Sequence, residues 1–358
     1  MRTTVGLMAL FSALTLAAGC APDPAPTPAP AQDPVSPVLA AAAEAAPPQA
    51  PPATPTSLIR QETPVALPTP RPTPTAAEAN PPTAEATQVT PTAPPTATPP
   101  PPTAEDGLPA DHYILARPIS EGYTTYLDRT YPYGGTSGGR FRPHTGVEFF
   151  NPEGTPVLAV ANGVVEYAGT DAEILYGPQP NFYGNLIVLR LDATFNGRPI
   201  FALYGHLSQM YVTTGETVSI GQTIGAVGGT GIANGGAHLH FEVRLDSALD
   251  YFTATRNPDL WIRPYYGYGT LAGRITGADG SLLPEVSITI KTDDWVRYTW
   301  TYAGAENIPS ETWGENFTYG DLPEGWYSVT FGVGGKTYRE QVYIRAGRTS
   351  WLEFATGG

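Results

Sequence analysis

Residues 238–243 read His238-Leu239-His240-Phe241-Glu242-Val243, a run that is too short for a helix. In a β-strand, side chains two positions apart point to the same face. His238 and His240 would then project together, while Leu239 faces the core. The stretch therefore predicts a strand that presents two imidazoles to one metal ion or one substrate.

The same short apolar runs recur earlier in the chain. They lie at residues 155–160, 163–167, 186–191 and 200–204, and Gly, Asn or Asp bound them. No long amphipathic helix pattern occurs after the first 110 residues, and only residues 257–261 predict a short helical turn. We therefore expect an all-β domain at residues 111–268.

A second β-rich unit is expected at residues 269–358. Residues 271–290 alternate apolar and polar side chains and turn at Asp279-Gly280, as a hairpin does. Residues 317–331 repeat this pattern. The unit resembles a carboxypeptidase-regulatory-like, transthyretin-type β-sandwich.

The N-terminus has the pattern of an export signal. Arg2 precedes an apolar core that is too short to span a bilayer, and the run ends at Cys20, the only cysteine. Residues 1–20 resemble a lipoprotein signal peptide, although Ala17 stands where leucine is more typical. This resemblance implies an extracytoplasmic protein of a bacterial cell envelope, anchored to the membrane through a lipid on Cys20. Secretion after ordinary cleavage is the alternative.

Residues 21–110 are rich in Pro, Ala and Thr and contain almost no large apolar side chains. Such a segment cannot bury enough apolar surface to fold. We expect a disordered, semi-stiff linker that separates the folded part from its anchor.

The charge of the chain excludes one class of partner. The formal net charge is -14 and the pI is about 4.7, and the only lysines are Lys291 and Lys336. Non-specific nucleic-acid binding depends on Lys and Arg, so we expect no nucleic-acid partner. A biotinyl or lipoyl carrier is also excluded for residues 111–268, because no lysine is available there for modification.

Four of the five histidines lie in three short strings. These are His144-Thr-Gly-Val-Glu148, Tyr204-Gly-His206 and His238-Leu-His240. Imidazole and carboxylate are the usual nitrogen and oxygen ligands of zinc, and a catalytic site uses three of them. If residues 144–148 are extended, His144 and Glu148 share one face and Gly146 leaves the space between them clear. His112 has no such partner and is expected to be structural.

These strings resemble the motifs of the M23 family of zinc endopeptidases, the lysostaphin and LytM type that cleaves peptidoglycan peptides. The first family motif corresponds to His144 through Glu148, followed by Pro152-Glu-Gly-Thr-Pro-Val157. The others correspond to Tyr204-Gly-His-Leu207 and His238-Leu-His240, and residues 218–231 match a glycine-rich hairpin of the family. The resemblance implies a LytM-like open β-sheet.

The resemblance implies a role for each motif residue. His144, Glu148 and His240 would ligate one Zn²⁺ per chain, and His206 and His238 would handle protons during hydrolysis of the peptide bond. Either histidine could be the base. The family normally has aspartate where Glu148 stands. A catalytically inactive domain that binds the wall or activates another hydrolase is therefore the alternative function.

Further residues are candidates for ligand contact. Tyr183, Asn185 and Tyr204 could meet the substrate as phenols and an amide near the histidine strings. In the C-terminal unit, Trp295 and Trp300 stand among charged residues, so we expect a weak glycan contact there.

Overall fold

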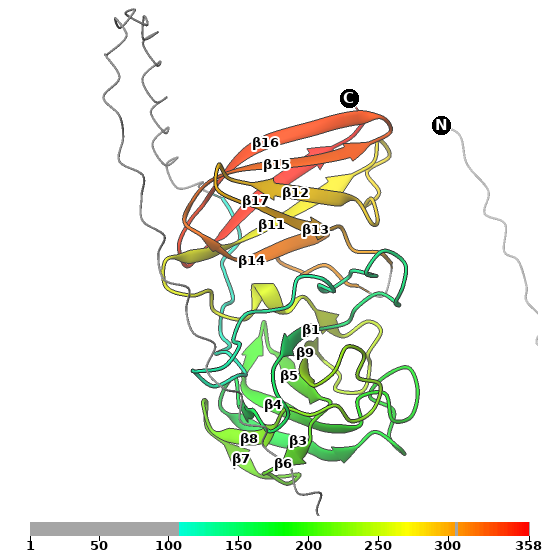
Figure 1. Ribbon diagram of the computed structural model, residues 1–358, viewed down its shortest axis with the longest axis vertical. Helices are drawn as coiled ribbons and strands as arrows, with labels where there is room; N and C mark the ends of the chain where they lie inside the picture. Colours follow the sequence, from blue (N-terminus) through cyan, green and yellow to red (C-terminus); the bar gives the residue numbers. More distant parts are fainter. Residues whose placement is uncertain (1–106, 305–306, 358) are drawn as a thin grey trace, which may run out of the picture. The chain divides into compact units, whose positions relative to one another are not determined.

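A computed structural model describes residues 107–304 and 307–357. These residues belong to one compact unit that is built almost entirely from β-strands (Figure 1). The predicted signal peptide with Cys20 and the predicted linker up to residue 106 lie outside the described residues. Within the described ranges, no helix is long and apolar enough to cross a bilayer. The all-β class predicted from the sequence is confirmed.

A seven-stranded sheet forms the centre of the N-terminal half. Its path is β1 (Val147–Phe150), β9 (His238–Leu245), β5 (Arg198–Gly205), β4 (Asn185–Phe195), β3 (Gly163–Thr170) and β7 (Thr217–Val218), and β10 (Thr255–Arg256) also pairs with β9. A smaller sheet has the order β2 (Pro156–Leu158), β8 (Thr223–Ala226) and β6 (Gln209–Met210). Each of the five apolar runs in the sequence contains or overlaps one of these strands.

Strand β9 lies inside the large sheet, where every one of its residues is buried. Leu239, Phe241 and Val243 pack into the main hydrophobic core, and the alternate side chains face the histidine cluster. The sequence predicted this division for His238, Leu239 and His240. Because β9 is flanked by neighbours on both sides, its position is rigid, which favours a precise site.

The C-terminal half consists of two further sheets around their own core. One sheet has the order β14 (Phe317–Pro323), β11 (Tyr268–Thr276) and β17 (Thr349–Ala355), and the other has the order β13 (Val296–Trp300), β12 (Ser287–Lys291), β15 (Gly325–Val333) and β16 (Lys336–Ile344). Leu271 and Phe317 from the first sheet pack against Ile288 and Val329 from the second. This is a β-sandwich. A turn lies at residues 278–280, but the predicted hairpin is wrong, because β11 and β12 belong to different sheets and the turn is closed only by an isolated bridge between Thr276 and Leu282. The same holds for β14 and β15, where the pattern was expected to repeat.

The two halves share side chains at their junction. Tyr302 and Trp313, from the C-terminal half, belong to the main core together with Trp261. The short helix η1 (Pro258–Leu260) lies in this region, where a helical turn was predicted, and the Asn257 side chain caps it. The predicted domain boundary at residues 268 and 269 falls inside β11.

His112 is buried in the same region and contacts the rings of Phe195 and Trp261. Burial lowers the pKa of this imidazole to about 4. It lies apart from the histidine cluster, as its isolated place in the sequence predicted.

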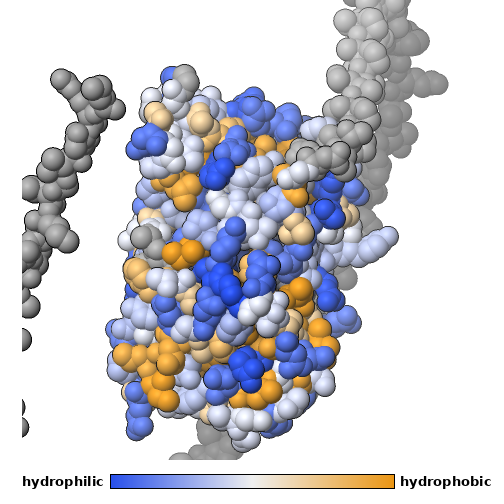
Figure 2. All heavy atoms as spheres, turned by 180° about the vertical axis from the view of Figure 1, so that it is seen from behind, coloured by the Kyte–Doolittle hydropathy of each residue, from blue (hydrophilic) through white to orange (hydrophobic). Residues whose placement is uncertain are grey.

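The surface is mixed in character. Figure 2 shows small groups of hydrophobic residues among hydrophilic ones on the face opposite to that of Figure 1. Scattered exposed apolar residues are normal on a folded protein and indicate no binding site by themselves.

Candidate metal centre and active site

Glu148 and His240 are brought together by strand pairing. β1 and β9 are antiparallel, and Glu148 lies directly opposite His240 in their register. Residues that face each other across such a pair have their side chains on the same side of the sheet. The pairing therefore places the carboxylate against the imidazole, although 92 positions separate them in the chain.

His144 reaches the same point from a loop. β1 begins only at Val147, so the extended conformation expected across residues 144–148 covers just its second half. Two backbone hydrogen bonds hold His144 against the loop that contains Gly134 and Gly135. The Gly134 N–H donates to the His144 carbonyl at 2.9 Å, and the His144 N–H donates to the Gly135 carbonyl at 3.0 Å.

Gly146 has the role that the sequence suggested. A Cβ atom at this position would lie 2.5 Å from the Phe241 carbonyl oxygen and 2.8 Å from His240 Nε2. Both distances are far below ordinary van der Waals contact. Only glycine therefore allows the loop to approach β9 closely enough for His144 to join the cluster.

The three donor atoms form a compact triangle. Glu148 Oε1 lies 2.9 Å from His144 Nε2 and 3.0 Å from His240 Nδ1, and the two nitrogens are 3.3 Å apart. Ligands of a tetrahedral zinc ion, bound at about 2.0–2.1 Å, lie about 3.3 Å from one another. The three side chains are buried and fit a zinc ion with only a small adjustment.

The other ring nitrogens of these histidines have fixed partners. His144 Nδ1 lies 2.7 Å from the Tyr131 carbonyl, and His240 Nε2 lies 3.0 Å from Glu242 Oε1. Each oxygen accepts a hydrogen bond from the nitrogen that faces it, which leaves His144 Nε2 and His240 Nδ1 to point at the common centre. Metal-binding histidines are oriented in this way by a carboxylate or a carbonyl.

Glu242 is the centre of a buried network that the sequence analysis missed. Its carboxylate accepts hydrogen bonds from Tyr183 Oη at 2.5 Å, Thr145 Oγ1 at 2.7 Å and Arg244 Nε at 2.6 Å. Glu242 and Arg244 are fully buried. Continuing the alternation of His238 and His240 along the strand would have identified both residues. Glu242 lies two positions after His240, and Arg244 lies two positions after Glu242.

The charges in the site stabilise one another. Burial alone would raise the pKa of Glu148, but His240 and His144 hold the pKa of this carboxyl well below its usual range. Burial would also lower the pKa of His240, but Glu148 and Glu242 raise it to about 9. The pocket thus favours a positive charge beside Glu148, and a metal cation that displaced the imidazolium proton would provide one.

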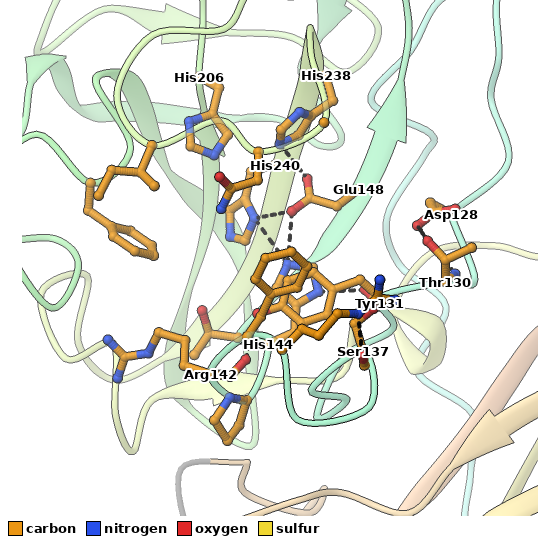
Figure 3. Close-up of a pocket in the computed structure, with 18 of the residues that line it drawn as sticks. Asp128, Thr130, Tyr131, Ser137, Arg142, His144, Glu148, His206, His238 and His240 are labelled. Atoms are coloured by element: carbon orange, nitrogen blue, oxygen red, sulfur yellow. Dashed lines mark hydrogen bonds and ion pairs between the residues drawn. The ribbon is translucent and has the colours of Figure 1, made fainter.

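His206 and His238 complete the group of four histidines. Figure 3 shows them near Glu148, whose carboxylate is joined by dashed lines to His144, His238 and His240. The rings of His206 and His238 are 4.8 Å apart, and His238 Nε2 lies 3.2 Å from Glu148 Oε2. Their Nδ1 atoms face the carbonyls of Thr230 and Gly236, both at 2.8 Å, so their Nε2 atoms are directed to the cluster.

The backbone of His206 is strained. It has a φ of 63°, which non-glycine residues rarely adopt, directly after the end of β5. Such a conformation costs about 1–3 kcal/mol and persists where the surroundings impose it. Burial lowers the pKa of His206 to about 4, so its ring is neutral at physiological pH.

The cluster lies at the base of a cleft of about 580 Å³. One wall is the loop at residues 131–143, which contributes Tyr131, Arg140 and Phe141, and Phe182 and Ile232 also line the cleft. The Tyr131 ring stacks on the His144 imidazole, with centroids 4.0 Å apart and planes 7° from parallel. The loop therefore shapes the cleft and supports His144 at the same time.

The three residues expected to contact substrate do not line this cleft. Tyr183 is fully buried and donates to Glu242, and Tyr204 is fully buried and accepts a hydrogen bond from the Val160 backbone. The Asn185 amide donates to the Leu207 carbonyl at 3.0 Å. The sequence expectation is corrected here: the side chains of these three residues bond to the protein itself and hold the scaffold.

Comparison with known proteins finds similarity over the segment that contains this site. The model of peptidase family M23 matches residues 142–250. An uncharacterized metalloprotease of Haemophilus influenzae is 40% identical over 108 residues, which are 30% of this chain and 20% of that protein. The peptidoglycan DD-endopeptidase ShyC of Vibrio cholerae is 38% identical over 104 residues, 29% of this chain and 21% of the relative.

A lipoprotein NlpD/LppB homolog of Pseudomonas aeruginosa is 34% identical over 118 residues, 32% of this chain and 35% of the relative. The chain thus spans about a fifth to a third of the length of these relatives. The matched segment contains the three donor residues and both further histidines. Over residues 142–250, the chain is thus similar to peptidase family M23.

Proposed function

We propose that residues 111–268 form a zinc-dependent endopeptidase that hydrolyses peptide bonds in peptidoglycan. The observation that carries this proposal is the triangle of donor atoms from His144, Glu148 and His240, set at the base of a cleft beside two further histidines. Three protein ligands and an open side towards a cleft are typical of catalytic zinc sites.

The residues would share the chemistry as follows. Zinc, when bound by His144, Glu148 and His240, supplies Lewis acidity that polarises a peptide carbonyl and acidifies water. The Nε2 atoms of His206 and His238 face the same point, so one imidazole can accept the proton of the attacking water. The other can donate a hydrogen bond to the developing oxyanion or a proton to the leaving amine.

Glu148 is compatible with this role despite being longer than the aspartate typical of the family. Its Oε1 already lies within 3.0 Å of both donor nitrogens, and its Oε2 lies 3.2 Å from His238 Nε2. The side chain is therefore positioned by its neighbours, and the backbone gives it room. We infer that the site is built around glutamate.

The substrate and location follow from the family and the sequence. The Vibrio cholerae relative is named as a peptidoglycan endopeptidase, and the Pseudomonas aeruginosa relative is named as a lipoprotein. We propose an extracytoplasmic protein, anchored to the membrane by a lipid on Cys20. Residues 21–110 would act as a linker, and residues 269–358 as a carboxypeptidase-regulatory-like sandwich.

The test combines zinc analysis with peptide release from purified sacculi. The wild type is expected to hold one zinc ion per chain and to release peptides, whereas His240→Ala should do neither. Glu148→Asp should lose activity, because shortening the side chain moves the carboxylate away from both nitrogens. Glu166→Gln, at an exposed ion pair with Arg190, serves as the control.

Two results would oppose the proposal. A folded wild-type protein that binds no zinc and releases no peptide, but still binds sacculi, would indicate the inactive wall-binding module instead. A Glu148→Asp variant that is much more active than the wild type would show that the glutamate is a poor ligand in this site.

A further inference from the structure

A second hollow lies on the sandwich, far along the chain from the histidine cluster. It has a volume of about 470 Å³ and lies on the four-stranded sheet β13-β12-β15-β16, whose strands are labelled in Figure 1. Cavities of this size are typical of small-molecule sites. The zinc peptidase chemistry does not use it.

The sheet alternation makes this face polar. Ile288, Ile290 and Val329 point into the sandwich core, so the residues between them point outward. On the outer face, Thr289 lies opposite Thr330, which in turn lies opposite Arg339 on β16. A parallel row runs from Lys291 through Ser328 to Gln341. Two rows of hydroxyl, amide and cationic groups thus cross three strands.

The charges of the hollow differ from those of the rest of the chain. The protein has a formal net charge of -14, and many of its arginines form ion pairs, such as Arg274 with Glu353 in the same sandwich. Lys291 and Arg339 both line the hollow and make no ion pair among the described residues. Asp293 is the one carboxylate among the described lining residues. Two cations against one carboxylate leave the hollow with a net positive charge that suits a single anionic group.

An indole ring forms part of the wall. Trp326 lines the hollow and is half-buried, and the Tyr343 ring packs against it edge to face, with centroids 5.4 Å apart. Trp295, which the sequence suggested for glycan contact, instead packs against the sandwich core beside Tyr327 and does not line the hollow. A supported tryptophan next to hydroxyl groups offers a ring face and hydrogen bonds in one place.

We propose that this hollow binds an acidic saccharide, in which a sugar ring carries a carboxylate. The ring would lie against Trp326, its hydroxyls would bond to the threonine and serine rows, and the carboxylate would meet Lys291 or Arg339. A phosphodiester polymer of small polyols carries negative charge, but it has no sugar ring that could pack against the Trp326 indole.

Calorimetric titration of the full-length protein with tetragalacturonate tests this site. Binding is expected, and fully methyl-esterified tetragalacturonate should bind at least about tenfold more weakly, because it lacks the charge. Lys291→Gln, Arg339→Gln and Trp326→Ala should each weaken binding by about tenfold. Lys336→Gln is the matched control: it removes the same charge from β16, outside the hollow, and should change affinity by less than about twofold.

The outcomes separate clearly. Absence of tetragalacturonate binding, equal binding of the methyl ester, or an equal loss in Lys336→Gln would overturn the proposal. Tighter binding of a glycerol-phosphate oligomer would show that the ligand is a phosphodiester and not a carboxylated sugar. Arg339 is exposed, so its variant should fold even if Trp326→Ala does not. Repeating the titration with zinc removed distinguishes this site from the peptidase, since binding should not change.

Discussion

Replacing Glu242 with glutamine should weaken zinc binding without removing any zinc ligand. Glu242 accepts a hydrogen bond from His240 Nε2 at 3.0 Å and forms an ion pair with Arg244. The side chains of Glu242 and Arg244 are both fully buried. Loss of such a partner of a metal-binding histidine typically lowers metal affinity by about 10–100-fold. We expect a loss in this range for Glu242→Gln.

The same change should lower the stability of the fold. Arg244 would remain buried without its carboxylate partner, and breaking a buried ion pair in this way costs about 3–5 kcal/mol. Tyr183→Phe is the milder variant: it removes the hydrogen bond to Glu242 and the one that Arg244 Nη2 donates to the hydroxyl at 3.1 Å, keeps the ion pair and should cost about 1–3 kcal/mol. Its zinc affinity should fall between those of Glu242→Gln and the wild type.

Zinc affinity is measured by competition with a chromophoric chelator, and the free energy of unfolding by urea titration of the zinc-free protein. Glu166→Gln is the control, because Glu166 forms an exposed pair with Arg190 at 3.2 Å, and such pairs contribute about 1 kcal/mol or less. If Glu242→Gln and Tyr183→Phe both fold and bind zinc as tightly as the wild type, the network does not position His240 and our reasoning fails.

Three further predictions concern the surroundings of the site. Gly146→Ala should reduce zinc affinity by about tenfold or more and destabilise the fold by about 1–3 kcal/mol, because the new Cβ would collide with β9. Gly332→Ala is the control: its Cβ would meet no atom closer than 3.8 Å, so zinc affinity and stability should not change. Asn307→Ala removes a buried hydrogen bond of 2.7 Å to the His144 carbonyl. Chelator competition should show weaker zinc binding, and urea titration should show a loss of about 1 kcal/mol in the free energy of unfolding. Unchanged zinc affinity would mean that Asn307 does not help to hold His144. Burial raises the pKa of Glu315 to about 7, so this carboxyl lowers the stability of the wild type as the pH rises from about 4.5 to about 7. Glu315→Gln should therefore gain up to about 3 kcal/mol over the wild type across that range, and parallel pH profiles of unfolding for the two proteins would contradict the assignment.

Local sequence patterns were sufficient for the strands and for part of the site. The alternation along residues 238–243 predicted β9, the shared face of His238 and His240, and the inward position of Leu239. These features depend on the two-residue period of a strand, which operates between neighbours in the chain. Glu242 and Arg244 follow the same period and were within reach of the same argument.

Other features required contacts between distant parts of the chain. The sequence predicted an extended segment at residues 144–148, but His144 lies in a loop held by Gly134 and by Asn307 of the sandwich. Tyr183 was expected at the cleft, yet the fold turns its hydroxyl towards Glu242. No local pattern specifies such contacts, because they depend on which surfaces meet after the sheets form.

The sequence by itself thus determined the β-strand composition, the family motifs, and the four histidines and Glu148 that gather at the cleft. Tertiary structure alone decided how the donor atoms approach one another, which buried groups orient them, and that Trp326 rather than Trp295 lines the hollow of the sandwich. The physical reason is that side-chain alternation is a local property of the backbone. Cross-strand register and domain packing, in contrast, bring together residues that lie about 90 to 160 positions apart in the chain.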